Sequence, residues 1–305
     1  MVAHLKLAIT GTTGFVGRRL LALAAEAGHE IRALARRPQD EHQGVTWIEG
    51  ALDRPDRLEH LLEGADAVVH VAGVINAPDA AGFEAGNVAG TAAVIAASKK
   101  AGTRRFVHVS SLAAREPGLS VYGATKARSE ALVSSSGLDW AIVRPPAVYG
   151  PGDRETLDLF RMAKSGLILL PPSGRLSLIH VDDLGRLLVG LAASADASGL
   201  LLEPDDGREG GWTHAEFGKA IGEALGRRVL GIATPRPVLD LCARADRLVR
   251  RGRAKLTPDR VAYFCHPDWT VDPRRKVPGR LWTPQVETRR GLADTVSWYR
   301  KQGWL

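Results

Sequence analysis

Cysteine is scarce in this chain, and no long apolar run occurs. The two cysteines, Cys242 and Cys265, are too few for a disulfide framework, and no Cys/His spacing predicts a metal site. No stretch of about 18 apolar residues is present, so we expect no membrane-spanning helix. The chain enters its first apolar run within a few residues, without a charged and then apolar leader. We therefore expect a cytoplasmic protein rather than a secreted one.

Positive charge is distributed unevenly. The net charge is +7, and residues 236–255 contribute five of these charges, with seven Arg or Lys against two Asp. No basic stretch is interleaved with aromatic residues, as nucleic-acid-binding surfaces are, so we expect no nucleic-acid partner. The apolar content of 45% and the length of 305 residues suit a globular chain with a main domain and a smaller lobe.

A glycine-rich turn lies near the start of the chain. The apolar run Leu5–Ile9 predicts a strand and Arg18–Ala27 predicts a helix, and between them glycines stand at positions 11, 14 and 17. Glycines let the backbone approach a pyrophosphate, and the N-terminus of a helix offers free N–H groups and the positive end of its dipole. Glycine turns also serve ordinary helix–strand packing, so this motif gains its weight from the later ones.

The first half of the chain alternates predicted strands with predicted helices. Short apolar runs predict strands at Leu5–Ile9, Glu30–Ala35, Thr46–Glu49, Ala67–Ala72, Arg105–Ser110 and Asp139–Arg144. Helices are predicted at Arg18–Ala27, Arg54–Leu62, Phe83–Ala101 and Tyr122–Ser134, with glycines near their C-terminal ends. This alternation predicts an α/β fold with a doubly wound Rossmann parallel sheet.

The pattern changes after Arg144, where Pro145–Pro146 and Gly150–Gly152 interrupt it. Beyond this point we predict a helix over 155–165, a strand over 176–181, a helix over 182–194 and an added strand at Leu200–Glu203. We expect the dinucleotide-binding domain to cover 1–149, with 176–200 returning to it. A smaller C-terminal substrate-binding lobe is expected to consist of 150–175 and 201–305.

Tyr122 and Lys126 stand four residues apart on a predicted helix. Residues at this spacing share a face, so the phenol and the ammonium can point into one cleft. A nearby ammonium favours the phenolate and is expected to lower the pKa of the tyrosine from about 10. Such a tyrosine can give a proton to a developing alkoxide or take one from an alcohol, and the lysine can also bind a ribose. By itself the spacing is more typical of a half-exposed amphipathic helix.

Two serines, Ser110 and Ser111, end the predicted strand before this helix. Ligands of parallel sheets bind at the carboxyl ends of the strands, where a serine can hold a substrate oxygen. A serine in this position is also a common turn former or helix N-cap. The glycine turn, the paired serines and Tyr-x-x-x-Lys in this order are more specific than any one of them.

With these motifs the sequence resembles the short-chain dehydrogenase/reductase superfamily, in particular its extended branch of epimerase/dehydratase-like proteins. The resemblance covers residues 4–200 and includes Thr10–Gly17, Val69–Gly73, Asn87–Thr91, Ser110–Ser111, Tyr122–Lys126, Arg144–Gly152 and Ile179–Asp183. It implies that Tyr122 is the general acid/base and that Lys126 binds the ribose and tunes Tyr122. It also implies that Ser111 orients the substrate, with Ser110 as the alternative, and that Asn87 supports the active-site helix.

The dinucleotide is expected to contact the glycine turn and the ends of the neighbouring strands. The predicted contacts are Gly11, Thr13, Gly14, Phe15, Val16, Gly17, Arg36, Arg37, Leu52, Asp53, Val71, Ala72, Gly73, Lys126, Pro145 and Val148. The family often has an acidic residue after Gly50 that reaches the adenine amine, but this chain has Ala51 there. Leu52 is expected to pack on the adenine, while Asp53 either replaces the missing acid or caps the next helix.

The end of the second predicted strand favours NADP(H) over NAD(H). NAD-binding folds place Asp or Glu about 20 residues after the glycine turn. No carboxylate occurs between residues 31 and 39, and Arg36 and Arg37 stand there instead. A guanidinium suits a 2′-phosphate because its planar fork meets the phosphate oxygens. We predict that Arg36, ahead of Arg37, binds this phosphate with help from Arg18, the alternative being a solvated arginine pair before a proline turn.

Asn76, Tyr149 and Trp269 are weaker candidates for substrate contact. Loop asparagines mostly form turns, and packing explains Tyr149 equally well. The tryptophans after residue 265 are expected to form mainly the core of the second lobe, with Trp269 as the best candidate for a pocket. His70 is expected to be a buried, hydrogen-bonded residue rather than a catalytic one.

Residues Val238–Arg251 predict an amphipathic helix. One face carries Val238, Leu241, Cys242, Ala245, Leu248 and Val249, and arginines occupy much of the other. Packing of the apolar face on the second lobe is the ordinary interpretation. Contact of a basic amphipathic helix with an anionic membrane surface is the alternative.

Taken together, the motifs predict an NADP(H)-dependent oxidoreductase that moves a hydride between nicotinamide and a small-molecule carbonyl or alcohol, with Tyr122 exchanging the proton. A nucleotide-sugar epimerase or dehydratase with bound NAD(P) is one alternative, and a non-catalytic NADP(H)-sensing or assembly factor is another. A homodimer fits the resemblance, because helices that flank the active site often pair in this superfamily. The sequence does not identify the substrate.

Overall fold

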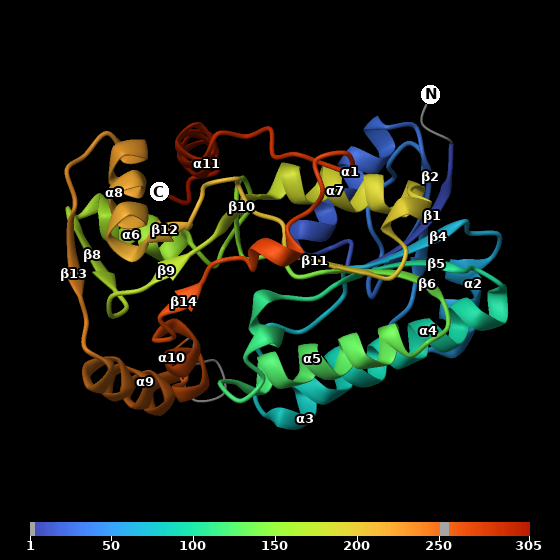
Figure 1. The fold of residues 1–305 in the computed structure, drawn as a ribbon, viewed down its shortest axis with the longest axis horizontal. Coiled ribbons are helices and arrows are strands. Elements are labelled where there is room, and N and C mark those ends of the chain that lie inside the picture. The colour runs from blue at the N-terminus through green and yellow to red at the C-terminus, as the bar shows by residue number, and fades with distance from the viewer. Residues whose placement is uncertain (1–3, 251–255) are drawn as a thin grey trace. The chain divides into compact units, whose positions relative to one another are not determined.

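The computed structural model describes residues 4–250 and 256–305, and the chain folds into two compact units (Figure 1). Unit 1 comprises the residues up to Pro145 together with Asp182–Pro204 and Arg275–Thr283. Unit 2 comprises Pro146–Val181, Asp205–Arg274 and Pro284–Leu305. Each unit therefore gathers stretches that are far apart in the sequence.

Unit 1 is built on a parallel sheet. Within the described residues this sheet has seven strands in the order β11-β6-β5-β4-β1-β2-β3, and each neighbouring pair is parallel. The strands are β1 Lys6–Thr10, β2 Glu30–Ala35, β3 Val45–Glu49, β4 Ala67–His70, β5 Arg105–Val109, β6 Asp139–Val143 and β11 Leu200–Leu202. All residues of β4 and β5 are buried, as expected of central strands covered on both faces. The predicted doubly wound Rossmann sheet is confirmed.

Helices cover both faces of this sheet (Figure 1). On one face lie α1 Phe15–Glu26 and α7 Val181–Ala193, and on the other lie α2 Pro55–Leu62, α4 Gly90–Ala101 and α5 Val121–Ser134. Gly185 of α7 allows close packing on α1, because a Cβ there would lie 2.5 Å from Cδ1 of Leu23. Arg19 of α1 donates two hydrogen bonds to Asp182 at the start of α7. These contacts hold α7 against α1.

The helix predicted at Phe83–Ala101 begins earlier and is irregular. It starts as α3 Ala80–Phe83, where the side chain of Asp79 accepts a hydrogen bond from Gly82 N. It passes through a π-helical stretch, Glu84–Ala89, and continues as α4. Such stretches are rare and are frequent at functional sites. Asn87 lies within this one.

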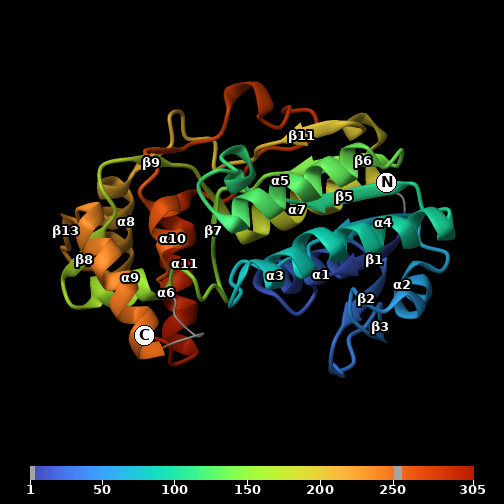
Figure 2. The same ribbon diagram turned by 90° about the horizontal axis from the view of Figure 1, so that it is seen from below.

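Unit 2 consists of short sheets and helices around a core of its own. Its strands are β7 Ala147–Tyr149, β8 Leu167–Leu170, β9 Arg175–Leu176, β10 Leu178–His180, β12 Trp212–Thr213, β13 Leu230–Ala233 and β14 Asp268–Trp269. They pair as β10-β7, β13-β8 and β12-β9-β14. The helices are α6 Leu157–Lys164, α8 His214–Leu225, α9 Arg236–Arg250, α10 Pro258–Phe264 and α11 Thr288–Lys301 (Figure 2). Their core includes the aromatic side chains of Tyr149, Phe160, Trp212, Phe217 and Tyr299.

The boundaries of the units differ from those expected from the sequence. β7 and β10 pair with each other, with Val148 opposite Ile179, so both strands belong to unit 2 rather than to the main sheet. β11 joins the main sheet beside β6. Glu203, just after β11, donates its backbone N–H to the carbonyl of Arg275 at 2.8 Å. This contact accounts for the return of residues 275–283 to unit 1.

The structure also describes the two cysteines and the lengths of the helices. Cys242 is exposed, Cys265 is half-buried, and both are free thiols. Within residues 4–250 and 256–305, no helix has the length and apolar character needed to cross a bilayer.

Candidate active site

The turn between β1 and α1 is shaped by its glycines. Gly11 has a φ of 77°, and a Cβ there would lie 2.5 Å from the backbone nitrogen of Ala72. Only glycine fits a left-handed position with this contact. α1 begins at Phe15, and no side chain of the described residues caps it at Gly14. The N–H groups of its first turn are therefore left for a ligand, and the turn fits a pyrophosphate.

The segment after β4 runs beside this turn. Val71 donates its N–H to the carbonyl of Thr10, and Ala72 donates to the Thr10 hydroxyl, both at 3.3 Å. Gly73 follows and is exposed. A Cβ on Gly73 would lie 3.1 Å from Oδ1 of Asn87 and 3.8 Å from Nζ of Lys126. The predicted cofactor contacts at 71–73 therefore adjoin two of the predicted catalytic residues.

Asn87 connects the segment after β4 to the helix that carries the tyrosine. Its Oδ1 accepts from Val74 N at 2.7 Å, and its Nδ2 donates to Val74 O and to Thr125 Oγ1, each at 3.0 Å. The side chain is 1% exposed. Asn87 thus holds α5 against the segment after β4, as the proposed supporting role requires.

Ser111 and Tyr122 are brought together by the start of α5. Ser111 precedes a 3₁₀ turn, Leu112–Arg115, and its hydroxyl accepts a hydrogen bond from Ala113 N at 3.2 Å. Gly123 lets α5 approach this turn, because a Cβ there would lie 2.6 Å from Ala113 O. The hydroxyls of Ser111 and Tyr122 are hydrogen-bonded to each other. Two hydroxyls therefore converge at the end of β5, where a carbonyl oxygen can be bound.

The prediction that Lys126 lowers the pKa of Tyr122 was wrong. Burial raises the pKa of this phenol, and the hydrogen bond with Ser111 lowers it by less, so the pKa lies above its ordinary value. Burial disfavours the phenolate because it removes the charge from water. The ammonium of Lys126 is instead engaged with a backbone carbonyl. At neutral pH the phenol is a proton donor.

Lys126 is almost fully buried, 3% exposed, on the face of α5 toward β5. Its Nζ donates to the carbonyl of Val109 at 2.8 Å. Burial lowers the pKa of this lysine to about 8, against the opposing effect of the Glu130 carboxylate. Lys126 is therefore charged at neutral pH, in the state that can donate to a ribose hydroxyl.

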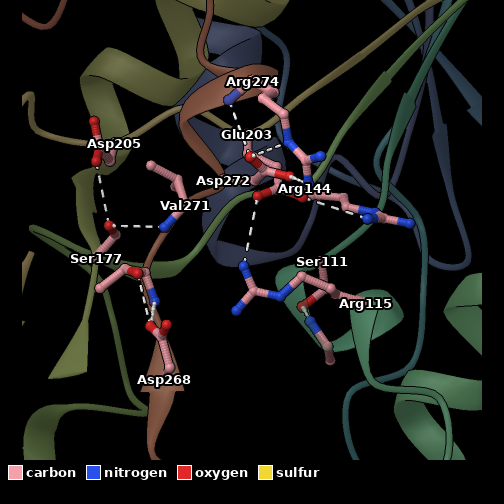
Figure 3. Close-up of polar contacts among 12 residues, drawn as sticks. Ser111, Arg115, Arg144, Ser177, Glu203, Asp205, Asp268, Val271, Asp272 and Arg274 are labelled. Carbon is pink, nitrogen blue, oxygen red and sulfur yellow. Dashed lines mark hydrogen bonds and ion pairs between the residues drawn. The ribbon is translucent and has the colours of Figure 1, made fainter. Parts of the chain in front are cut away.

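A buried ionic cluster of Glu130, Arg144 and Glu203 lies at the ends of β5, β6 and β11. Ser110 donates to Glu130 at 2.5 Å, and Arg144 donates to both oxygens of Glu130 at 2.8 and 2.6 Å. Arg144 also reaches Glu203, which is fully buried and paired with Arg115 at 3.8 Å. Figure 3 shows both arginines directed at Glu203. Because Ser110 is held by Glu130, Ser111 is the serine available to a substrate oxygen.

Sequence reasoning missed this cluster. The spacing of Lys126 and Glu130, four residues apart on one helix, was the one signal available for it. Arg144 and Glu203 come from distant parts of the chain, and only the sheet order brings them together.

His70 is buried and hydrogen-bonded, as predicted. Its Nδ1 lies 2.7 Å from Thr10 Oγ1 and its Nε2 lies 3.0 Å from Thr91 Oγ1. Burial lowers the pKa of His70 to about 3, so the ring is neutral. It stacks on His108 of the neighbouring strand at a ring distance of 5.4 Å. These rings serve the packing of the sheet and leave no role for His70 as an acid.

Arg36 and Arg37 follow β2 and are exposed. Among residues 4–250 and 256–305, no ion pair engages either side chain, so both are available to a phosphate. Leu52 packs on Gly90, where a Cβ would lie 2.6 Å from its Cδ1. Asp53 does not cap α2, because the residue at that position is Arg54. A contact of Asp53 with the adenine stays a prediction.

The remaining predicted cofactor and substrate contacts lie in different parts of the chain. Pro145 is buried in unit 1, and its carbonyl accepts from Leu112 N at 3.1 Å. Val148 lies in β7 of unit 2. Asn76 is exposed in the loop before α3. Tyr149 is fully buried in the core of unit 2, where its hydroxyl donates to Thr288 O at 3.4 Å, so packing accounts for it.

Trp269 also has a packing role. It is 6% exposed, it stacks on Tyr263 at a ring distance of 4.5 Å, and its Nε1 donates to Tyr263 O at 2.8 Å. Neither Trp269 nor Tyr149 presents an open aromatic face to a substrate.

Comparison with known proteins identifies relatives along the whole chain. Residues 11–165 match a family described as NAD(P)H-binding. A ceramide reductase of Caulobacter vibrioides is 37% identical over 314 residues, covering 98% of this chain and 95% of the relative. A 2-alkyl-3-oxoalkanoate reductase of Stenotrophomonas maltophilia is 29% identical over 328 residues, covering 94% and 97%.

Solved structures share the fold. MoeE5 in complex with UDP-glucose and NAD has a TM-score of 0.76 at 22% identity, covering 97% of this chain and 99% of the other. A UDP-N-acetylglucosamine 4-epimerase from Bacillus cereus has a TM-score of 0.72 at 17% identity, covering 97% and 96%.

Proposed function

Because the chain belongs to the extended, epimerase/dehydratase-like branch of the short-chain dehydrogenase/reductase superfamily and is an NAD(P)-dependent oxidoreductase, we propose that it uses NADPH to reduce a ketone. The observation that carries the proposal is the Tyr122 phenol beside Ser111, a proton donor in place at the end of β5, and the direction is taken from the two relatives named as reductases. A protonated phenol is the form needed to complete reduction, whereas oxidation needs the phenolate.

The proposed substrate is a ketone that carries a long alkyl chain. Two reductases that this chain covers along nearly their whole length are named for ceramide and for 2-alkyl-3-oxoalkanoates. The first name is that of a lipid, and the second describes a 3-oxo acid that carries an alkyl substituent. This chemistry, rather than a sugar nucleotide, is therefore the first to screen.

Each of the site residues of unit 1 has a separate role in the proposed reaction. When bound, the cofactor supplies a hydride to the carbonyl carbon. Ser111 donates a hydrogen bond to the carbonyl oxygen, and Tyr122 gives that oxygen its proton, so the ketone becomes an alcohol. Lys126 donates to the ribose hydroxyls, and the first turn of α1 binds the pyrophosphate. Positioning and a proton donor already in place are the contributions of the protein.

Replacement of the tyrosine tests the proposal. We expect Tyr122→Phe to bind NADPH as the wild type does and to lose about 10²- to 10⁴-fold in kcat, because it lacks the proton donor. Steady-state kinetics with a long-chain ketone and fluorescence titration with NADPH measure the two quantities. Tyr299→Phe, which removes a phenol hydroxyl from the core of unit 2, is the control. Near-normal turnover by Tyr122→Phe would refute the assignment.

The arginines after β2 test the choice of cofactor. We expect Arg36→Ala to weaken NADPH by about 10- to 100-fold, since a hydrogen bond to a charged group contributes about 1.5–3 kcal/mol, and to leave NADH unchanged. The exposed Arg54→Ala is the matched control. Equal affinity of the wild type for NADPH and NADH would contradict a 2′-phosphate site.

Net oxidation of NADPH distinguishes a reductase from the alternative, a nucleotide-sugar epimerase. A reductase consumes one NADPH for each alcohol formed, while an epimerase regenerates its bound cofactor in each cycle. Oxidation of NADPH in proportion to product supports the reductase. Conversion of a sugar nucleotide without net oxidation would support the epimerase.

A further inference from the structure

The two-stranded sheet of β8 and β13 has one uncovered apolar face. In β8, Ile168 and Leu170 are buried in the core of unit 2, and the alternate residues Leu167 and Leu169 point outward. β13 pairs in parallel so that Leu230 and Ile232 stand opposite these two residues. The four outward side chains are 37–66% exposed. Large aliphatic residues on a surface in such a group are unusual for a monomer.

α9 follows β13 directly and exposes the apolar face predicted from the sequence (Figure 1). Leu241, Leu248 and Val249 are 68%, 81% and 82% exposed. The opposite side of the helix, at Ala243, is fully buried. The expectation that the apolar face packs on the lobe is therefore wrong. The helix instead packs through its small residue and turns its large aliphatic residues outward.

Basic residues flank both apolar patches, that of β8 and β13 and that of α9, in the sequence. Lys164, Arg227 and Arg228 are exposed just before β8 and β13 begin. Arg236 and Arg244 are exposed on α9, and five further Arg or Lys follow in the sequence by residue 255.

The acids of the α9 segment are engaged locally. Asp240 pairs with Arg236 at 3.8 Å, and Asp246 accepts from Leu256 N at 2.9 Å. Among the described residues named here, five basic side chains stand against these two acids.

We propose that the exposed apolar residues of β8, β13 and α9 dock on the surface of an anionic lipid bilayer. Leu, Ile and Val would enter the boundary between headgroups and acyl chains, and the basic residues would contact the anionic headgroups. A polar face with Lys and Arg beside an aliphatic face is the pattern of interfacial helices. The helix need not span the membrane for this contact.

A second copy of the chain fits this face less well. A two-fold dimer places the same surface of both copies together, so the basic residues would meet and repel. Protein interfaces are also enriched in aromatic residues and depleted of Lys, whereas this face is aliphatic and flanked by basic residues. The charge and the side-chain types therefore favour lipid.

Vesicle flotation tests the proposal with the full chain. The vesicles are phosphatidylcholine alone or phosphatidylcholine with phosphatidylglycerol, at low and high salt. One variant is Leu241→Gln with Leu248→Gln in α9, and a second is Leu230→Gln with Ile232→Gln in β13. Ile75→Gln is the matched control, because Ile75 is 51% exposed but lies in unit 1. NADPH binding by each variant reports that it is folded.

We expect the wild type and Ile75→Gln to float with anionic vesicles only, and high salt to weaken the binding. Each double variant should lose at least tenfold in its partition coefficient. Equal binding to both lipid compositions, or no binding at all, would overturn the proposal. A change of oligomeric state in the variants by light scattering, without a change in flotation, would assign the face to a protein partner instead. The assay contains no substrate, so its failure leaves the proposed reaction untouched.

Discussion

At Lys126, burial and a neighbouring carboxylate act in opposite directions, and burial prevails. The pKa of about 8 means that the ammonium is present below this value and is lost as the pH rises through it. Binding of the ribose by the charged form then weakens. We expect kcat/KM for NADPH to be level near neutral pH and to fall above about pH 8.

A pH profile of ketone reduction measures this effect. Removal of the carboxylate in Glu130→Gln takes away the interaction that raises the pKa, so the fall should begin at lower pH. A profile that is level from about pH 7 to 10 would show that the charge of Lys126 is not required. Arg54→Ala, which alters an exposed charge, should leave the profile unchanged.

Some properties of single residues could be predicted from the sequence, and others could not. Residue type and spacing pointed to Tyr122, Lys126 and the serine pair at the end of β5, because helical periodicity and strand ends fix where such side chains point. Their roles came from the family resemblance. The direction of the pKa of Tyr122 depends on burial, which spacing does not reveal. The choice between Ser110 and Ser111 required the position of Glu130.

At the scale of elements, the cluster around Arg144 ties the ends of three strands to α5. Arg144 pairs with Glu130 and Glu203, whose side chains are 8% and 0% exposed. Removal of one partner leaves a buried charge uncompensated, which costs about 3 kcal/mol or more. We expect Arg144→Met to lower the free energy of unfolding by this amount and also to reduce kcat, because the end of β5 carries Ser111.

Urea unfolding and steady-state kinetics measure the two effects. Arg54→Ala removes an exposed arginine and should change the free energy of unfolding by less than about 0.5 kcal/mol. An Arg144→Met protein as stable as the wild type would mean that the cluster contributes no net stabilisation. Loss of stability with unchanged kcat would separate the cluster from the active site.

The elements that were predicted differ from those that were missed in length and burial. Parallel strands covered on both faces are continuous apolar runs, so β2 was predicted to the residue and most others to within one or two. The strands of unit 2 have two to four residues and are separated by prolines and glycines, so their sequence carries no periodicity. The helices α8 and α11 were missed for a different reason, because glycines at 218, 222 and 291 interrupt their helical pattern.

At the scale of the whole molecule, the predicted cofactor contacts other than Val148 lie in one unit. We expect NADPH to slow amide hydrogen exchange at residues 11–17 and 71–73, because these segments would contact it. The core helices α8 and α11 of unit 2 should exchange at the same rate with and without NADPH. Hydrogen exchange followed by mass spectrometry gives this map. Equal protection of both units would mean that binding stabilises the protein as a single cooperative body.

The interleaving of the chain has a consequence for biosynthesis. During translation the first 145 residues leave the ribosome well before α7 and β11, which complete one face and one edge of the sheet. Until then the nascent sheet has an unpaired edge at β6 and an apolar surface beside α1, both of which invite aggregation. Early chaperone engagement and slow maturation of the newborn polypeptide are therefore to be expected, and a gene fragment ending near codon 150 would be a poor source of soluble Rossmann domain.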